Sequence, residues 1–397
     1  MFIGKKIVEL YQLLRFTKFN VFLPGKKPLL IYDRLGERHL SNYFNSKSYE
    51  VLDVRKESLN IAILLISLIK YFFNKRSISQ SYCVEYIKYV QPRVVITTID
   101  NNINFWTYKE IFRNIKFVFI QNGTRGVIGD VFDLLINNND HKQKKYFVDC
   151  MFVFGQTSER LYREYLDGEI YRIGSFINNM DHPIEDCSRD VTYVLQFKTI
   201  GKDKAYRYKT ATGKKITWDD CYKYNIKIIK YLRNYCVDNK LSFSILGRSK
   251  LLSEQIEEEK YISKIIPKDS YEYIPSIQKY TSYEELLRSK IIVVMESTLG
   301  YEMLARRKRV VYLGVREDTL GESSRFGWPD LPKKGFFWTN EFKISEFNRV
   351  TNNVVYSTDK EWKDVCDSHV PGLIEYDPGN SKFLSIMNKL NVDLYKV

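Results

Sequence analysis

Short apolar runs rich in β-branched residues recur along the chain, and each is followed by polar residues. Residues 290–313 show the pattern in full, with an apolar run at 291–295, a polar turn, a helical segment and a second apolar run from 310. Runs of this kind fill strands that are buried on both faces of a sheet. Strand, turn, helix and strand make a βαβ unit, in which the strands are parallel and the crossover is right-handed.

The same alternation predicts strands and helices in two successive halves of the chain. In the first half we expect strands at 29–33, 49–53, 94–99, 117–120, 148–154 and 170–175, and helices at 1–23, 59–73, 81–90, 105–112 and 156–165. In the second half we expect strands at 191–197, 241–246, 291–295 and 310–314, and helices at 218–239, 253–259, 282–288 and 301–305. Strands that alternate with helices predict an α/β fold with mainly parallel sheets.

Two features refine this picture. The apolar segment 59–73 is too short to span a membrane and is interrupted by Asn60, Ser67 and Lys70, so we expect a buried helix there. The stretch 178–190 is polar and aperiodic and therefore predicts a linker. We predict Rossmann-like domains at 1–180 and 190–375, and a C-terminal helix at 376–397 that returns to the N-terminal domain. Two Rossmann-like domains that face each other across a cleft form the architecture called GT-B.

Composition and charge add information about partners. A chain of 397 residues is long enough for two domains of ordinary size. A net charge of +14 predicts an acidic partner, which can be nucleic acid, an anionic membrane surface or an acidic substrate. The six cysteines form no C-x-x-C pair and no zinc-type spacing with histidine, so we expect reduced core thiols, a cytosolic protein and no metal site.

Several catalytic signatures do not occur. The chain has no G-x-x-x-x-G-K-[ST] loop, and no G-x-G-x-x-G follows a predicted strand, which disfavours P-loop and dinucleotide enzymes. It also has no G-x-S-x-G elbow, no H-E-x-x-H and no D-x-D. The remaining candidates are polar residues just past strand ends, where ligands of open α/β sheets bind.

In the first half, polar residues follow two neighbouring predicted strands. Asp100 ends one of these strands, so its carboxylate is a candidate general base; the alternative is a helix N-cap. The further candidates, which we expect to bind an acceptor, are Asn101, Asn102, Gln121, Asn122, Gly123 and Arg125. The alternatives are a simple turn at Asn122-Gly123 and a solvated surface position for Arg125.

In the second half, the candidates would bind phosphate. Arg248 follows a glycine at a strand end, and a guanidinium binds phosphate oxygens in bidentate fashion. Glu296 begins a polar turn and is a second candidate catalytic carboxylate. The remaining donor-site candidates are Lys198, Ser297, Thr298, Gly300 and Glu302. The turn at 297–300 offers hydroxyls and a helix N-terminus to a phosphate, although an ordinary helix cap gives the same pattern.

Six short motifs, taken together, resemble a known family. They are Ile99-Asp100-Asn101-Asn102, Ile120-Gln121-Asn122-Gly123-x-Arg125, Phe154-Gly155, Ile173-Gly174-Ser175, Ser297-Thr298-Leu299-Gly300-Tyr301-Glu302-x-Leu304-Ala305-Arg306 and Phe326-Gly327-Trp328-Pro329. In order and spacing they resemble the bacterial surface-carbohydrate (O-antigen or capsule) biosynthesis family, over most of the chain from about residue 52 to 380. The resemblance implies transferases with a GT-B fold.

The S-T-L-G-Y-E turn also resembles the donor-phosphate loop of other GT-B enzymes, including capsule transferases that use CMP-activated acidic sugars. Those enzymes carry a His-Pro pair that holds the nucleotide, whereas the corresponding region here, Ile266-Pro267-Lys268, has no histidine. The resemblance implies a nucleotide-sugar donor, with a CMP-activated acidic sugar among the options. It implies no separate cofactor and no metal.

The sequence therefore predicts a metal-independent GT-B glycosyltransferase that extends a cell-surface glycan. The first domain would bind a glycan or lipid-linked acceptor and the second the donor. We expect a cytoplasmic protein that binds peripherally to the anionic inner face of the membrane and binds no nucleic acid. Two alternatives stay open. A polyol-phosphate transferase of teichoic-acid type would need histidine-rich turns, and the chain has four histidines; a basic nucleic-acid-binding protein would gather its charge on one face.

Overall fold

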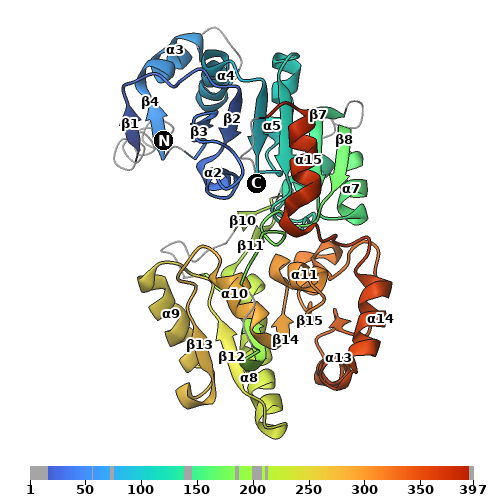
Figure 1. Cartoon of the computed structure of the whole chain (residues 1–397). Helices are drawn as coiled ribbons and strands as arrows, with labels where there is room; N and C mark the ends of the chain where they lie inside the picture. Colours follow the sequence, from blue (N-terminus) through green and yellow to red (C-terminus); the bar gives the residue numbers. More distant parts are fainter. Residues whose placement is uncertain are drawn as a thin grey trace.

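The computed structural model describes residues 17–55, 57–71, 76–137, 145–183, 187–198, 208–210 and 213–392. Figure 1 shows two α/β domains, one above the other, each built on a six-stranded sheet. The strands of each sheet pair in parallel throughout. The predicted α/β fold with two Rossmann-like domains across a cleft is confirmed.

The sheet of the first domain has the strand order β3-β2-β5-β6-β7-β8. Its strands are β2 (Leu29–Tyr32), β3 (Tyr49–Leu52), β5 (Val94–Thr97), β6 (Lys116–Ile120), β7 (Tyr146–Val153) and β8 (Leu166–Arg172). Its helices are α2 (Arg34–Leu40), α3 (Ile61–Tyr71), α4 (Ile78–Val90), α5 (Ile103–Ile111), α6 (Val131–Asn137) and α7 (Gln156–Arg163). Because helices cover both faces, β2 and β5 are buried along their whole length, as their apolar runs predict.

The sheet of the second domain has the strand order β13-β12-β9-β14-β15-β16. Its strands are β9 (Arg189–Val194), β12 (Phe243–Leu246), β13 (Glu272–Ile274), β14 (Ser289–Val294), β15 (Arg309–Leu313) and β16 (Trp338–Thr339). Its helices are α8 (Trp218–Asp238), α9 (Leu252–Ser263), α10 (Thr281–Leu287), α11 (Thr298–Ala305), α12 (Glu317–Leu320), α13 (Ile344–Tyr356) and α14 (Asp359–His369). A short antiparallel pair, β10 (Tyr208–Lys209) and β11 (Lys215–Ile216), precedes α8.

Strand order fixes where ligands can bind. In the first sheet β2 lies between β3 and β5, and in the second β9 lies between β12 and β14. The chain therefore winds away from β2 and from β9 in both directions. At such a switch point the loops beyond the carboxyl ends diverge and leave a crevice, and ligands of open α/β sheets bind there. The two crevices lie beyond β2 and β5, and beyond β9 and β14.

The last helix, α15 (Ser381–Lys389), packs against the first domain although it follows the second in sequence. Its buried Phe383 and Met387 belong to the same apolar cluster as Ile31 of β2 and Phe152 of β7. The rings of Phe152 and Phe383 meet edge to face at 5.0 Å. The C-terminal helix thus returns to the first domain and packs beside its sheet (Figure 1).

Two local predictions were wrong. The apolar helix α3 buries Ile63 but leaves Leu65 56% and Ile69 63% exposed, because no described element packs against its outer face. The helix predicted at 1–23 lies outside the described residues as far as residue 16; it is wrong for 17–23, which contain strand β1 (Lys18–Asn20), paired in parallel with β4 (Ser58–Asn60). Of the six cysteines, Cys187 is exposed and the others are buried.

Candidate active site between the two domains

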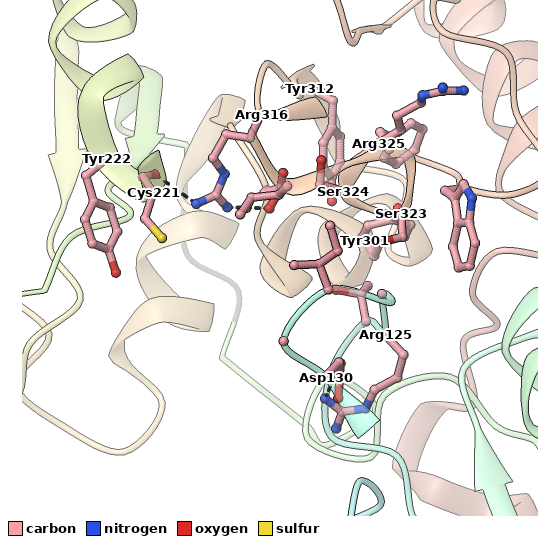
Figure 2. Close-up of a pocket in the computed structure, with 18 of the residues that line it drawn as sticks. Arg125, Asp130, Cys221, Tyr222, Tyr301, Tyr312, Arg316, Ser323, Ser324 and Arg325 are labelled. Carbon is pink, nitrogen blue, oxygen red and sulfur yellow. Dashed lines mark hydrogen bonds and ion pairs between the residues drawn. The ribbon is translucent and has the colours of Figure 1, made fainter. Parts of the chain in front are cut away.

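A cavity of about 380 Å³ lies between the domains, beyond the carboxyl ends of β9 and β14. Figure 2 shows that residues of both domains line this cleft cavity, with Arg125 and Asp130 approaching from the loop after β6. Its basic side chains are Arg125, Lys198, Arg248, Arg316 and Arg325, and its acidic side chains are Asp130 and Glu296. The excess of basic over acidic side chains favours an anionic ligand.

Glu296 and Arg316 form a pair in the wall of the cleft cavity. Arg316 donates to the Glu296 carboxylate and to Gln196 Oε1 (2.8 Å), and its Nη1 donates to the Cys221 carbonyl (2.9 Å; Figure 2). Burial raises the pKa of Glu296, and the Arg316 charge opposes that shift only in part. Burial lowers the pKa of Arg316, but Glu296 raises it by more, so the net pKa is raised.

This pair is incompletely hydrogen-bonded. Oε1 of Glu296 and Nε of Arg316 are both buried and have no hydrogen-bond partner in the described part of the chain, and the same is true of Arg325 Nε. Buried polar groups are rarely left unpaired, because desolvation without a partner costs about 1–3 kcal/mol each. Three such atoms around one cavity indicate that a polar ligand completes their hydrogen bonds.

Arg248 is a cation whose backbone is held in place by a buried carboxylate. The buried carboxylate of Glu258, on α9, accepts the backbone N–H of Arg248 and of Ser249 (both 3.1 Å) and the hydroxyl of Tyr273 (2.8 Å). The Arg248 side chain is exposed, lines the cleft cavity and has no ion pair or hydrogen bond to any described residue. It is therefore available to a phosphate group.

Arg125 is positioned by a buried network. Its guanidinium donates to both oxygens of Asp100 (Nε to Oδ2, 2.6 Å) and to Asn122 Oδ1 (2.6 Å), and the Tyr162 hydroxyl donates to Asp100 as well. Burial alone would lower the pKa of Arg125, but the Asp100 carboxylate raises it by more. Arg125 thus reaches the cleft cavity as a permanently charged and rigidly held cation.

The prediction that Asp100 faces the cleft as a base was wrong in its geometry. Asp100 is fully buried, lines no described cavity and has its carboxylate occupied by Arg125 and Tyr162. The helix-cap alternative also fails, because Asn102 is the N-cap of α5. Asn102 thereby serves the helix instead of an acceptor. Asn101 is exposed and donates to Asp130 (3.3 Å) without lining the cleft cavity.

The predicted acceptor residues at 121–123 separate into different roles. Gln121 is buried and bridges backbone groups, since its amide donates to the Gly123 carbonyl and accepts from Phe154 N–H (both 2.8 Å). Gln121 and Asn122 line a second, smaller cavity in the first domain. Gly123 lies against Thr298 of the second domain.

The predicted phosphate loop at 297–300 also differs from expectation. Ser297 caps α11, its hydroxyl accepting from Leu299 N–H, and Thr298 Oγ1 accepts the Thr124 N–H of the first domain (3.2 Å). Gly300 is buried against β15 instead of a ligand, because a β-carbon there would lie 2.4 Å from the Tyr312 hydroxyl. The close approach at Gly300 is thus one of helix to strand, and Glu296 is the one residue of 296–300 that lines the cleft cavity.

Glu302, predicted as a donor-site residue, lies where the segment that connects the two domains meets α11. It is buried, and its carboxylate accepts from Ser175 and from Tyr283 (2.9 Å), while its carbonyl accepts from Asn178 (2.9 Å). Burial raises the pKa of this carboxyl, against the hydrogen bonds of Ser175 and Tyr283. Glu302 therefore joins the inter-domain connector to α11 and does not contact the cleft cavity.

The structure brings Lys198, Arg248, Glu296 and Arg125 together around the cleft cavity, as the sequence suggested. It adds Arg316, Arg325 and Asp130, which sequence reasoning missed. A signal for Arg316 was present, because it follows the predicted strand at 310–314 by two residues. No comparable signal marks Asp130, which lies at the start of a short helix. Among the described residues, no group of three or more His, Cys, Asp or Glu is arranged to hold a metal ion.

Solved structures with a similar arrangement are GT-B proteins. UDP-GlcNAc 2-epimerase of Methanocaldococcus jannaschii, in complex with UDP-GlcNAc and UDP, is 9% identical, covers 91% of this chain and 99% of its own, and has a TM-score of 0.50. Also similar is sucrose-phosphate synthase of Thermosynechococcus elongatus, which is 10% identical, covers 92% of this chain and 98% of its own, and has a TM-score of 0.47. The wall teichoic acid polymerase TagF is 10% identical, covers 92% of this chain and 89% of its own, and has a TM-score of 0.46. The protein is a member of the GT-B fold class.

The sequence itself assigns the family. Residues 118–391 match the family described as "putative O-antigen biosynthesis protein", and the chain belongs to that family. This confirms the resemblance drawn from the six motifs. A comparison with curated protein sequences gives no match.

Proposed function

We propose that the protein is a glycosyltransferase that moves a sugar from a nucleotide-activated donor to a growing cell-surface glycan, an O-antigen, capsule or related polysaccharide. Membership of the O-antigen biosynthesis family supports the pathway, and the GT-B fold supports the reaction class. The donor binds to the second domain in this proposal, and the acceptor reaches it from the first.

The observation that carries the proposal is the cleft cavity at the β9–β14 switch point. It combines an unpaired guanidinium at Arg248 with buried, unsatisfied polar atoms on Glu296, Arg316 and Arg325. Phosphate oxygens would pair with the guanidinium groups, and hydroxyl groups of ribose or sugar would donate to Glu296 Oε1. The epimerase of the same fold binds UDP-GlcNAc and UDP, which supports a nucleotide sugar as the ligand class.

In this proposal fixed cations assist departure of the leaving group. When the bond from the sugar to phosphate breaks, negative charge grows on the phosphate oxygen. Arg248, Arg316 and Arg325 lie around the same cavity and stabilise that charge, and Arg316 is already held by Glu296 and Gln196 before the reaction. We therefore propose that transfer needs no separate cofactor and no metal ion, and that a CMP-activated acidic sugar is among the donors to test.

A thermal-shift screen of UDP, GDP, dTDP, ADP and CMP tests this function. A nucleotide that occupies the cleft cavity at 100 times its Kd is expected to add about 2.7 kcal/mol to the free energy of unfolding and to raise the melting temperature. The stabilisation should persist in EDTA. If none of the five nucleotides raises the melting temperature, the proposal of a nucleotide-sugar donor is wrong.

We also propose that the protein binds peripherally to the anionic inner face of the cytoplasmic membrane. No helix of the described residues combines the length and hydrophobicity that a membrane crossing requires. Exposed apolar side chains gather instead on α3 and on the segment after β1, with Phe22 92% and Ile69 63% exposed. Asn60 donates to the Phe22 carbonyl (2.7 Å) and joins the two segments, at the end of the first domain remote from the second (Figure 1).

Binding to phosphatidylglycerol vesicles tests the membrane proposal. At low salt the protein is expected to sediment with these vesicles and to be released at high salt, because each Lys or Arg near an anionic surface contributes about 1 kcal/mol and salt screens it. Phosphatidylcholine vesicles serve as the uncharged control. A Phe22→Ser, Ile69→Ser variant should sediment less than the parent at low salt. Equal sedimentation of variant and parent would show that α3 is not part of the membrane-binding surface.

A further inference from the structure

A second cavity, of about 230 Å³, lies at the other switch point of the fold, beyond the carboxyl ends of β2 and β5 in the first domain. Leu35 follows β2, Thr98 follows β5 and Asn122 follows β6, and all three line it. We call it the first-domain cavity. Because Asn122 lines this cavity while the next residues, Thr124 and Arg125, line the cleft cavity, one short loop borders both.

His39 is the histidine of this cavity, and a neutral imidazole can accept a proton. It lies on α2, which packs closely on the strand ends: a β-carbon at Gly36 would lie 2.9 Å from Thr98 Oγ1. Its Nδ1 lies 3.4 Å from the hydroxyl of Tyr280, which belongs to the second domain. Its Nε2 has no hydrogen-bond partner in the part of the chain that the structure describes.

Behind the wall of this cavity lies a carboxylate that is incompletely hydrogen-bonded, like Glu296 in the cleft cavity. Arg55 lines the cavity and pairs with Asp33 (Nε to Oδ2, 3.1 Å). Asp33 is 1% exposed, and its other oxygen, Oδ1, is buried without a partner among the described residues. Asp33 also has a φ of 112°, a conformation that costs a non-glycine residue energy and is commonest where function requires it.

We propose that the first-domain cavity is the acceptor subsite and that His39 Nε2 is the base that takes the proton of the attacking hydroxyl. This inference rests on the proposed function. The acceptor oxygen forms a bond to the anomeric carbon as its proton passes to Nε2. The bond from that carbon to the donor phosphate breaks, and its electron pair leaves on the phosphate oxygen. The anomeric configuration is inverted.

The surroundings of His39 set the protonation state that this role needs. Burial lowers the pKa of the imidazole to about 4, and Lys279, Lys250 and Arg38 act in the same direction. The ring is therefore neutral throughout the neutral range, and the role we propose uses the tautomer in which Nδ1–H donates to Tyr280 and Nε2 carries the lone pair. Lys250 lies two residues from Arg248, so a donor phosphate bound there brings negative charge towards these cations. That charge raises the imidazole pKa and strengthens the base once donor is bound.

The pH dependence of the rate tests the role directly. The acid limb of kcat/KM reports the free protein and the acid limb of kcat reports the donor complex. We expect the limb of kcat to lie at higher pH than that of kcat/KM, with the rate falling as pH drops through each pKa. The charged or titratable groups that face His39 from other elements are Arg55, Lys250, Lys279 and Tyr280.

His39→Gln, with His369→Gln as the matched control, provides the mutational test. His369 packs on Trp338 in the second domain and lines neither cavity. Nucleotide release is measured with UDP-N-acetylglucosamine, GDP-mannose, dTDP-rhamnose and CMP-N-acetylneuraminate, with a detergent extract of bacterial membranes as acceptor. We expect His39→Gln to lower kcat about 10²–10⁴-fold and to remove its acid limb, with the Kd of the stabilising nucleotide unchanged. His369→Gln should keep the kcat of the parent protein and its acid limb.

The outcomes separate this inference from the proposed function. If no nucleotide binds the parent protein, the proposed function is wrong and the inference fails with it. If nucleotide binds and His39→Gln turns over like the parent, His39 is not the base. If His39→Gln does not fold, His39→Asn takes its place, since its amide lies near the Nδ1 position and can keep the contact with Tyr280. A rate for that variant equal to the parent's would likewise overturn the assignment.

Discussion

Replacing Arg248 by glutamine is expected to weaken nucleotide binding about 10–100-fold while leaving the melting temperature unchanged. A hydrogen bond to a charged partner contributes about 1.5–3 kcal/mol, and Arg248 is exposed, so its removal breaks no described ion pair. Its backbone stays in place because Glu258 holds the loop through the N–H groups of Arg248 and Ser249. Titration calorimetry with the nucleotide that raises the melting temperature measures the effect.

Arg113→Gln is the matched control for this experiment. Arg113 is an exposed arginine of the first domain and lines neither of the two cavities described above. Its variant loses the same charge and should bind nucleotide as the parent does. If Arg113→Gln weakens binding as much as Arg248→Gln, the effect comes from net charge alone and Arg248 is not a phosphate ligand. If neither variant weakens binding, the donor lies elsewhere.

Replacing Asp100 by asparagine is expected to destabilise the protein by about 3–5 kcal/mol. Asp100 is fully buried and Arg125 nearly so, its side chain being 10% exposed, so the substitution leaves a buried guanidinium with only its longer, 3.5 Å ion pair to Asp130. It also weakens the hydrogen bond that Tyr162 donates. Urea denaturation followed by circular dichroism measures the loss. A catalytic role for Asp100 would instead reduce turnover with little change in stability.

A double variant makes this test specific. Asp100→Asn with Arg125→Gln removes both charges, and it should recover part of the stability that Asp100→Asn loses, because no buried charge is then unpaired. Asp167→Asn is the control, since Asp167 is 63% exposed, 3.8 Å from Lys145, and such surface pairs contribute at most about 1 kcal/mol. Additive losses in the double variant would show that the Asp100–Arg125 pair does not determine stability.

His182 illustrates how the domain connection differs from a solvated linker. It lies within the predicted linker, yet it is buried and its ring stacks on Tyr283 at 4.7 Å. Asn178 and Asn179 of the same segment are fully buried and bond to Glu302, Ile173 and Asn380. Polarity in this segment reflects buried hydrogen bonds between the domains, which a hydropathy pattern cannot distinguish from exposure to water.

The sequence by itself determined the order of strands and helices. Continuous apolar runs such as 94–99 and 291–295 are removed from water only in a strand whose two faces are both covered by helices. It also indicated that Arg248 and Glu296 lie at the same edge of the sheet, where both line the cleft cavity, since polar residues just past parallel strands meet at one edge. These inferences need only the local pattern and the rule that ligands bind beyond the carboxyl ends of parallel strands. The six motifs together indicated the family, which no single local pattern identifies.

Only the tertiary structure decided which way the side chains at those strand ends point. Asp100 and Arg125 are 25 residues apart, and burial of the Asp100 carboxylate depends on Tyr162, a further 37 residues on, from α7. Gly300 faces Tyr312 because α11 rolls onto β15, and Glu302 faces the inter-domain connector because it lies on another side of that helix. His39 gave no signal in sequence, since its partner Tyr280 lies 241 residues away in the other domain. Contacts between distant segments set burial and direction, and neither is a property of the local sequence.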